Sequence, residues 1–210
     1  MSQSEKAQWR WRLRAARQSI PAQQAHAAAQ AACLSLINHA LWQRARSIGL
    51  YQPGDGEIDT QLLIEHAWQA NKSVYLPVIR PPRGEAGRKA ALRAGRLVFR
   101  RFTPHTPLRR GLLGIPEPIQ PLRPSGLAAA SIAIAALDLL VMPLVGVDAA
   151  GHRLGMGAGF YDRALAGRGR FRRPFRLGLA HACQQVPALP HDPWDEPLEA
   201  CVTDQTITTW

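Results

Sequence analysis

The sequence predicts an α/β fold: one three-layer α/β/α domain over residues 1–210, with a mostly parallel twisted sheet. Two observations support this prediction. Short apolar runs alternate along the chain with segments of helical periodicity, which is the order of strand, helix, strand units. The composition, with 46% apolar and 20% charged residues, is that of a globular protein, and 210 residues are within the range of one domain.

Two amphipathic helices are expected at the N-terminus. Residues 4–18 predict a short basic helix that ends near Ser19 and Pro21. A second helix over 21–44 then has the serine as its cap and the proline in its first turn, and its apolar residues recur at helical spacing.

The next segment predicts a strand, helix, strand unit. Residues 47–53 are an apolar strand that ends in a Pro-Gly turn, and 59–72 are a helix capped by Asp59 or Thr60. A strand over 73–79 follows. Two strands joined by a helix in this way indicate parallel neighbours in one sheet.

The middle of the chain is less regular. Residues 81–96 are expected to be a polar excursion, and 97–102 a less buried strand at the edge of the sheet. Residues 111–126 hold too many prolines for a regular element and are expected to run over the surface. A weak alanine-rich helix is predicted over 126–136.

The C-terminal third returns to regular elements. An apolar strand over 138–144 leads into a glycine-rich loop, and a helix over about 158–166 follows the loop. Further strands are expected at 175–181 and 200–204.

The chain has a formal net charge of +11, which is compatible with a basic nucleic-acid-associated protein. The excess is almost all arginine and is spread over separate segments, which favours a solvated surface. Nucleic acid is therefore not the expected partner, although this alternative stays open.

The sequence indicates neither export nor a membrane. No window reaches the roughly eighteen uncharged apolar residues of a spanning helix, and charges fill the N-terminus where a signal peptide would be apolar. We expect a cytoplasmic protein without membrane contact. Cys33, Cys183 and Cys201 are too far apart for a disulfide framework or a zinc site and are expected to be core thiols.

The glycine-rich loop is the clearest candidate for a binding site. Gly155, Gly157 and Gly159 lie on alternate positions between an apolar strand and the start of a helix. Backbone N–H groups in such a loop can approach an anion closely, and glycine permits positive φ. The spacing GxGxG is neither the dinucleotide fingerprint nor the P-loop, so spacing alone fits a tight turn without a ligand equally well.

The residues beside the loop favour a site for phosphate and metal. Arg153 adds positive charge, Tyr161 adds a ring or hydroxyl, and Asp162 is a hard oxygen ligand of the kind magnesium prefers. Asp192 and Asp195 follow the next predicted strand. Because ligand crevices form past the carboxyl ends of parallel strands, these two carboxylates are expected to meet the loop.

The loop and its flanks resemble the 5-formyltetrahydrofolate cyclo-ligases, also called 5,10-methenyltetrahydrofolate synthetases. That family carries an apolar strand and then a motif close to RLGxGxGYYDRxL, which here reads RLGMGAGFYDRAL at 153–165. Further matching pieces occur in family order across nearly the whole chain: KAQWR (6–10), YQPGDGEIDTQLLI (51–64), VYLPV (74–78), LLGIPEP (112–118), LDLLVMPLVGVD (137–148) and HDPWDEPLEACVTD (191–204).

The resemblance implies ATP-dependent cyclisation of 5-formyltetrahydrofolate to 5,10-methenyltetrahydrofolate, with release of ADP and phosphate and a need for Mg²⁺. The N5-formyl group is a poor electrophile, so phosphorylation of its oxygen would let N10 attack the formyl carbon. Such phosphoryl transfer needs cations, backbone N–H donors and Mg²⁺ rather than a dedicated nucleophile. With this small-molecule substrate the protein is expected to be a monomer.

The resemblance also assigns the nucleotide site by position. Lys6 and Arg10 would contact the ATP phosphates, and Arg153 and Tyr161 would be the catalytic residues. The nucleotide loop would comprise Arg153, Leu154, Gly155, Met156, Gly157, Ala158, Gly159, Phe160 and Tyr161.

The substrate and metal sites are carried over in the same way. Gln52 and Glu57 would line the folate pocket, where a carboxylate pairs well with the N–H donors of a pterin ring. Asp162 and Asp192 would bind Mg²⁺, with Asp195 as the alternative to Asp192.

The chain departs from the family motif at three loop positions. Ala158 stands where members commonly carry glycine or a basic residue, Phe160 replaces the first tyrosine of the usual pair, and Met156 lacks a ring or charge. Alanine tolerates only negative φ, so a need for positive φ at Ala158 would bend the loop differently and weaken ATP binding. Outside the loop, Trp9, Trp11 and Trp194 are expected to be core residues rather than stacking surfaces.

A second alternative is a sugar-phosphate or thioester enzyme on a similar sheet. Such an enzyme would need a general base or nucleophilic glutamate near the loop. Glu57 is the only candidate in the sequence, and it is remote from the loop along the chain.

Overall fold

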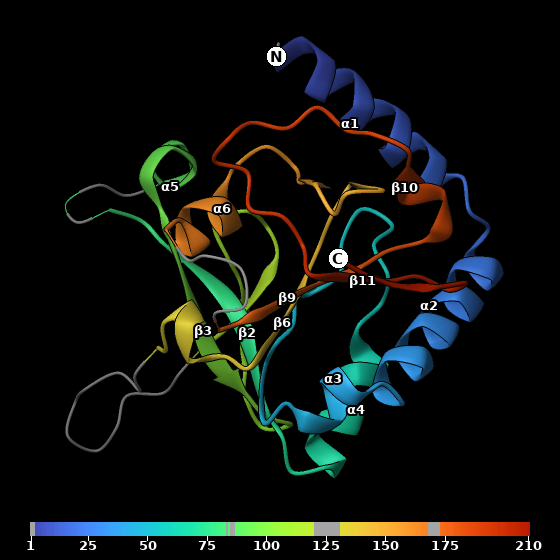
Figure 1. Cartoon of the computed structure of the whole chain (residues 1–210). Coiled ribbons are helices and arrows are strands. Elements are labelled where there is room, and N and C mark those ends of the chain that lie inside the picture. The colour runs from blue at the N-terminus through green and yellow to red at the C-terminus, as the bar shows by residue number, and fades with distance from the viewer. Residues whose placement is uncertain (1–2, 83, 85–86, 120–130, 168–172) are drawn as a thin grey trace.

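The centre of the fold is a seven-stranded sheet in the order β12-β11-β9-β6-β1-β2-β3 (Figure 1). A computed structural model describes residues 3–82, 84, 87–119, 131–167 and 173–210. The strands of the sheet are β1 (Ser47–Gly49), β2 (Ser73–Arg80), β3 (Arg96–Phe102), β6 (Leu139–Met142), β9 (Phe175–Leu179), β11 (Ala200–Val202) and β12 (Ile207–Thr209). The five inner strands run parallel, and the edge strands β3 and β12 run antiparallel to their neighbours. The predicted mostly parallel sheet and the edge position of residues 97–102 are confirmed.

Helices cover both faces of the sheet, which gives the predicted three layers. α2 (Ala22–Ile37), α3 (Ala40–Arg44) and α4 (Gln61–Gln69) pack on one face. α6 (Phe160–Leu165) and the one-turn 3-10 helix Ile134–Ala136 pack on the other. Figure 1 shows α2, α3 and α4 on one side of the strands and α6 on the other.

Strand β6 is buried on both faces. Leu139 and Val141 belong to the core under α2 and α4, whereas Leu140 and Met142 belong to the core under α6. A strand with helices on both sides has no solvated face, which explains why residues 138–144 form a continuous apolar run.

The single helix predicted over 21–44 is wrong, because the chain breaks it at His39. His39 has an extended backbone, and its Nδ1 accepts the N–H of Leu41, so it caps α3. The Gln43 side-chain amide donates to the carbonyl of Ile37 across the break. The apolar periodicity runs through the break because α2 and α3 bury side chains in the same core.

The helices α1 (Gln3–Gln18) and α4 agree with the predictions. At the start of α4 the Asp59 carboxylate accepts the N–H of Gln61, whereas the Thr60 hydroxyl donates to the carbonyl of Tyr51. Thr60 is thus at the N-cap position without a side-chain cap, and the Asp59 carboxylate before it accepts the first N–H of α4. Within the described part of the chain, no helix is both long and apolar enough to cross a membrane.

The middle region holds three short elements that the sequence analysis did not predict: α5 (Arg88–Ala94), β4 (Leu108–Arg110) and β5 (Pro116–Pro118). The excursion expected at 81–96 is mostly exposed over α5, but its helical conformation was not predicted, and the fully buried Ala91 packs this helix against the fold. Prolines are tolerated in β5 because a two-stranded hairpin consists only of edge strands. Residues 120–126 of the proline-rich segment lie outside the described residues.

The alanine-rich helix predicted over 126–136 is wrong in its described part. Ile132 pairs with Phe99 at the edge of the sheet, and only Ile134–Ala136 form a single 3-10 turn. Pairing with the sheet outweighs the weak helical propensity of a short alanine run. Residues 126–130 lie outside the described residues.

A small second sheet separates β6 from the glycine loop. β7 (Gly146–Asp148) and β8 (Arg153–Leu154) form a hairpin, and β10 (Gln185–Val186) pairs parallel with β7. The sequence analysis did not predict these strands, because elements of two or three residues leave no periodicity to detect. Arg153 therefore lies on a strand that fixes its direction, rather than in the loop itself.

Smaller differences concern strand lengths and cysteines. β1 is shorter than the predicted strand 47–53, and β9 and β11 each end two residues earlier than predicted. Cys33 and Cys201 are buried as expected, but Cys183 is exposed, so its assignment to the core is wrong.

Candidate functional site

A cavity of about 600 Å³ lies past the carboxyl ends of β1, β2 and β6. Every site residue named from the sequence lines this cavity. They come from α1, the turn after β1, the glycine loop with α6, and the loop before β11. The residues are Lys6, Arg10, Gln52, Glu57, residues 153–162, Asp192 and Asp195. The expected meeting of Asp192 and Asp195 with the glycine loop is confirmed.

The glycine loop takes positive φ at two positions, 99° at Gly157 and 63° at Gly159. Among the described residues, the non-glycine positions with positive φ are Asp55 and Asn71, so Ala158 has an ordinary conformation. The alanine at this position therefore causes no backbone strain.

We expect Gly157→Ala to lower the free energy of unfolding by about 1 to 3 kcal/mol, because alanine is strained at positive φ. Its Cβ would also lie 3.4 Å from the Arg10 Cζ. Ala158→Gly is the matched control and should cost less than about 1 kcal/mol, because it adds only chain entropy. Urea denaturation measures both. Equal losses in the two variants would contradict this description of the loop.

Two arginines hold the carbonyl groups of the loop. Arg10 Nε donates to the Gly155 carbonyl at 2.8 Å, and Arg163 Nη1 donates to the Ala158 carbonyl at 2.7 Å. The first contact joins the loop to α1, and the second joins it to α6. The shape of the loop is thus fixed from both sides.

Arg153 presents a buried cation with spare hydrogen-bonding capacity. Its side chain is 4% exposed, and its Nη2 donates to Asp162 Oδ1 at 2.8 Å. Its Nε is buried and has no hydrogen-bond partner among the residues that the structure describes. An unpaired buried N–H is costly, so an oxygen-bearing ligand at this point would be favoured.

Asp162 faces the cavity with one oxygen engaged. Its Oδ1 accepts hydrogen bonds from Arg153 and, at 3.3 Å, from the N–H of Glu196. Within the described ranges Oδ2 makes no hydrogen bond or ion pair, and no group of three or more His, Cys, Asp or Glu residues forms a metal cluster there. A Mg²⁺ ion needs only one or two protein carboxylates when phosphate and water fill its other positions.

Lys6 lies between two carboxylates rather than in solvent. Its Nζ is 2.7 Å from Asp192 Oδ2 and also forms an ion pair with Asp195 Oδ2. Burial lowers the pKa of Lys6, but the hydrogen bonds to both aspartates outweigh it, so the pKa is raised. The same contact lowers the pKa of Asp192. Lys6 therefore carries a full positive charge into the cavity.

Glu57 lines the cavity from the turn after β1. Its Oε2 accepts the N–H of Gly54 at 3.1 Å. Burial raises the pKa of Glu57, and the nearby Arg17 guanidinium opposes this effect. Gln52 lines the cavity beside it, and the Tyr51 hydroxyl donates to the Ile58 carbonyl at 3.0 Å.

The remaining wall of the cavity is apolar. It is formed by Pro77, Ile79, Leu97, Leu113 and Ile115. The cavity therefore has a charged half beside the glycine loop, where basic side chains lie among Asp162, Asp192 and Asp195, and an apolar half that suits a ligand with a flat ring system.

Glu117 is a charged cavity residue that the sequence analysis did not name. Glu117 on β5 is 6% exposed, and its Oε1 accepts the N–H of Ile79 at 3.2 Å. Burial raises the pKa of Glu117. Glu117 lies between two prolines in a segment that was expected to run over the surface, so its sequence context did not predict burial. Its place in the matching LLGIPEP piece was the one feature that indicated a role.

The tryptophan prediction is wrong at two positions. Trp194 is 70% exposed and lines the cavity, and Trp11 is 74% exposed on α1. Trp9 is half-buried, under the guanidinium of Arg12. Trp194 can therefore stack on a bound ligand, which the sequence analysis considered less favoured than packing in the core.

The comparisons with known sequences agree on one family. Residues 2–204 match the model of the 5-formyltetrahydrofolate cyclo-ligase family. A protein of Haemophilus influenzae with that name is 37% identical over 201 residues, which are 94% of this chain and 97% of that protein. The protein of that name from Escherichia coli K12 is 35% identical over 198 residues, covering 94% and 100% of the two chains.

Solved structures share the fold. The NMR structure of a 5,10-methenyltetrahydrofolate synthetase from Aquifex aeolicus matches with a TM-score of 0.76 at 23% identity, over 97% of this chain and 92% of that chain. A synthetase of the same name from Mycoplasma pneumoniae matches with a TM-score of 0.67 at 18% identity, over 95% and 99%.

Proposed function

The chain belongs to the 5-formyltetrahydrofolate cyclo-ligase family, and from this premise we propose that it converts 5-formyltetrahydrofolate and ATP to 5,10-methenyltetrahydrofolate, ADP and phosphate. The observation that carries the proposal is that one cavity combines a glycine loop flanked by basic side chains with an apolar wall near Glu57 and Glu117. A triphosphate and a flat heterocycle can bind there next to each other.

In this proposal the nucleotide lies against the glycine loop. Lys6, Arg10 and Arg153 supply three positive charges for the phosphates, and the unpaired Nε of Arg153 gains an acceptor. The positive φ at Gly157 and Gly159 keeps side chains away from the turn, which leaves room for phosphate oxygens.

Asp162 and Asp192 are the residues that we propose as Mg²⁺ ligands, with Asp195 as the alternative to Asp192. Asp162 fits this role because its Oδ2 makes no hydrogen bond or ion pair within the described residues. A bound Mg²⁺ would neutralise charge on the transferring phosphoryl group. Lys6 holds Asp192 and Asp195 at the same edge of the cavity.

The folate is proposed to lie against the apolar wall. Glu57 and Gln52 then accept and donate hydrogen bonds at the polar edge of the pterin ring. The aliphatic side chains of Ile79, Leu97 and Leu113 cover the ring faces and exclude water.

The reaction then proceeds in two steps. The formyl oxygen attacks the γ-phosphorus of ATP, and the bond from that phosphorus to the ADP oxygen breaks. The N10 lone pair next attacks the formyl carbon, and the bond from carbon to the phosphorylated oxygen breaks as phosphate leaves and N10 loses its proton. Arg153 stabilises the charge on the phosphoryl oxygens, and Tyr161, whose pKa is raised by burial, stays a neutral phenol that can donate a hydrogen bond.

An absorbance assay tests the proposal directly. Purified protein with 5-formyltetrahydrofolate, ATP and Mg²⁺ should form the methenyl product, and EDTA or omission of ATP should stop its formation. Mg-ATP should also raise the melting temperature, because it binds only the folded protein. Absence of both product and a nucleotide-dependent shift would reject the proposal.

The same preparation addresses the two alternatives. A basic nucleic-acid-associated protein would bind DNA or RNA with strong salt dependence. A sugar-phosphate or thioester enzyme would gain thermal stability from inorganic or sugar phosphate but not need a folate. We further propose a single cytoplasmic domain that acts as a monomer; gel filtration at assay concentration tests the last point.

A further inference from the structure

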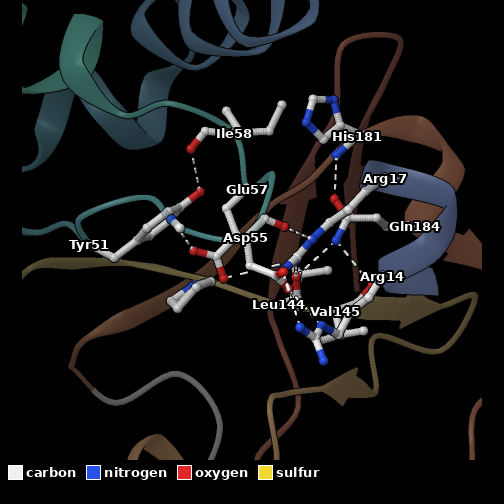
Figure 2. A network of polar contacts seen from close by, with 12 residues as sticks. Arg14, Arg17, Tyr51, Asp55, Glu57, Ile58, Leu144, Val145, His181 and Gln184 are labelled. Atoms are coloured by element: carbon white, nitrogen blue, oxygen red, sulfur yellow. Dashed lines mark hydrogen bonds and ion pairs between the residues drawn. The ribbon is translucent and has the colours of Figure 1, made fainter. Parts of the chain in front are cut away.

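Arg17 on α1 is a charged side chain with no exposed surface (Figure 2). All three nitrogens of its guanidinium donate hydrogen bonds. Nε donates to the Asp55 carbonyl and Nη2 to Asp55 Oδ2, both at 2.7 Å, while Nη1 donates to the Leu144 carbonyl at 3.0 Å. Nη1 also lies 3.9 Å from Glu57 Oε1. One side chain thus joins three segments that line the cavity.

The turn that carries Glu57 is held from α1. Asp55 has a positive φ of 54°, which a non-glycine residue keeps only where its surroundings impose it. Arg14 Nε donates to Asp55 Oδ2 at 2.7 Å, and the Gln18 side-chain amide donates to Oδ1. Hydrogen bonds from Arg14 and then from Arg17 lower the pKa of Asp55 to about 2. The direction of Glu57 therefore depends on α1.

The other contact of Arg17 fixes the end of β6. The Leu144 carbonyl also accepts a hydrogen bond from the Gln184 side-chain amide, at 2.8 Å. Leu144 lines the cavity and precedes the hairpin that leads to the glycine loop. Figure 2 shows Arg17 between this strand end and the turn at Asp55 and Glu57.

We propose that Arg17 is a positioning residue for the folate half of the cavity: it holds the turn that aims Glu57 at the substrate, from the same helix that carries the proposed nucleotide contacts Lys6 and Arg10. This inference rests on the proposed function. It assigns Arg17 no contact with substrate, only an effect through Glu57.

The charges around Glu57 give this role a pH signature. Arg17 faces Glu57 from α1, and Asp55 lies in its own turn. Tyr51 approaches from the segment just after β1, and Tyr161 from α6. Burial raises the pKa of Glu57, and Arg17 is the cation that opposes it. Removing that cation raises the pKa further. Glu57 would then become protonated, and folate affinity would be lost, at a higher pH than in the unchanged protein.

The test is Arg17→Gln, with KM for 5-formyltetrahydrofolate and for ATP measured between roughly pH 5 and 9. We expect KM for the folate to rise about tenfold at neutral pH. The acid limb of its pH profile, where KM rises as the pH falls, should move to higher pH. KM for ATP should change by less than about twofold. Arg14→Gln is the matched control, because Arg14 binds Asp55 but has no ion pair with Glu57. Its acid limb should stay in place.

A double-mutant cycle separates positioning from general stability. In Glu57→Gln, adding Arg17→Gln should not raise KM for the folate further, because the group through which Arg17 acts is already neutral. If the two substitutions raise KM for the folate independently, so that their effects multiply in the double variant, the proposal is overturned. An unchanged acid limb in the pH profile of Arg17→Gln would overturn it as well.

If Arg17→Gln is not recovered folded, Arg17→Lys serves instead. It keeps the charge but not the three-way hydrogen bonding, so the acid limb should stay while KM for the folate rises. An unchanged KM would refute the proposal. If the wild-type protein forms no methenyl product, the proposed function is rejected. If the wild type is active but the Arg17 variants do not change KM for the folate or its pH profile as expected, only the role of Arg17 is rejected.

Discussion

Asp162→Asn is expected to lower kcat at least about 100-fold while the fold stays intact. Asparagine keeps an oxygen for Arg153 and for the Glu196 N–H but loses the negative charge that we propose to bind Mg²⁺. Asp162→Ala should abolish turnover as well, but it leaves the buried Arg153 guanidinium without its carboxylate, which destabilises the protein. Asparagine is therefore the cleaner substitution.

The measurement is kcat as a function of Mg²⁺ concentration, together with the melting temperature. Glu65→Gln is the control, because it removes an exposed carboxylate on α4 away from the cavity. Asp192→Asn and Asp195→Asn, measured in parallel, decide which aspartate is the second ligand. Full activity of Asp162→Asn at ordinary Mg²⁺ would show that the metal assignment is wrong.

Lys6→Met is expected to raise KM for ATP about 30-fold, which corresponds to the loss of a charged hydrogen bond of about 2 kcal/mol. Methionine keeps the length and apolar stem of lysine and removes the ammonium group that lies between Asp192 and Asp195. The two carboxylates would then repel the phosphates without a cation between them. KM for the folate should change much less, because Lys6 belongs to the charged half of the cavity.

Lys89→Met is the matched control for this substitution. Lys89 lies on the exposed side of α5 and does not line the cavity, so its removal changes the net charge by the same amount without touching the site. A similar rise in KM for ATP in both variants would indicate a general loss of electrostatic attraction rather than a contact of Lys6.

The sheet could be predicted because its strands are buried on both faces or alternate with clear helices. β6 is the best example: a run of apolar residues with helices to cover it has no other stable place than the centre of a parallel sheet. The convergence of Asp192 and Asp195 with the glycine loop follows from the same topology, since all three come after carboxyl ends of neighbouring strands.

The features that were not predictable depend on contacts between segments far apart in sequence. His39 caps the start of α3 with its side chain just after α2 ends, and this break leaves the apolar periodicity unchanged. Glu117 is buried because β5 brings its carboxylate to the N–H of Ile79 on β2. The sequence around Glu117 has no pattern that predicts this contact. Trp194 looks like a core residue by type, but its loop places it at the open side of the cavity. The roles of these residues in binding stay predictions.

The edge strand β3 has a further consequence, for behaviour at high concentration. It carries the exposed Arg96 and Arg101 along the outer rim of the sheet, where Phe99 pairs with Ile132, whereas the half-buried Arg100 donates to the Pro118 carbonyl. Backbone N–H and C=O groups at the edge of a sheet can pair with a strand of another molecule, which leads to aggregation. Guanidinium groups on two such edges repel each other and oppose this pairing. We therefore expect these two arginines to oppose self-association by strand addition when the protein is concentrated.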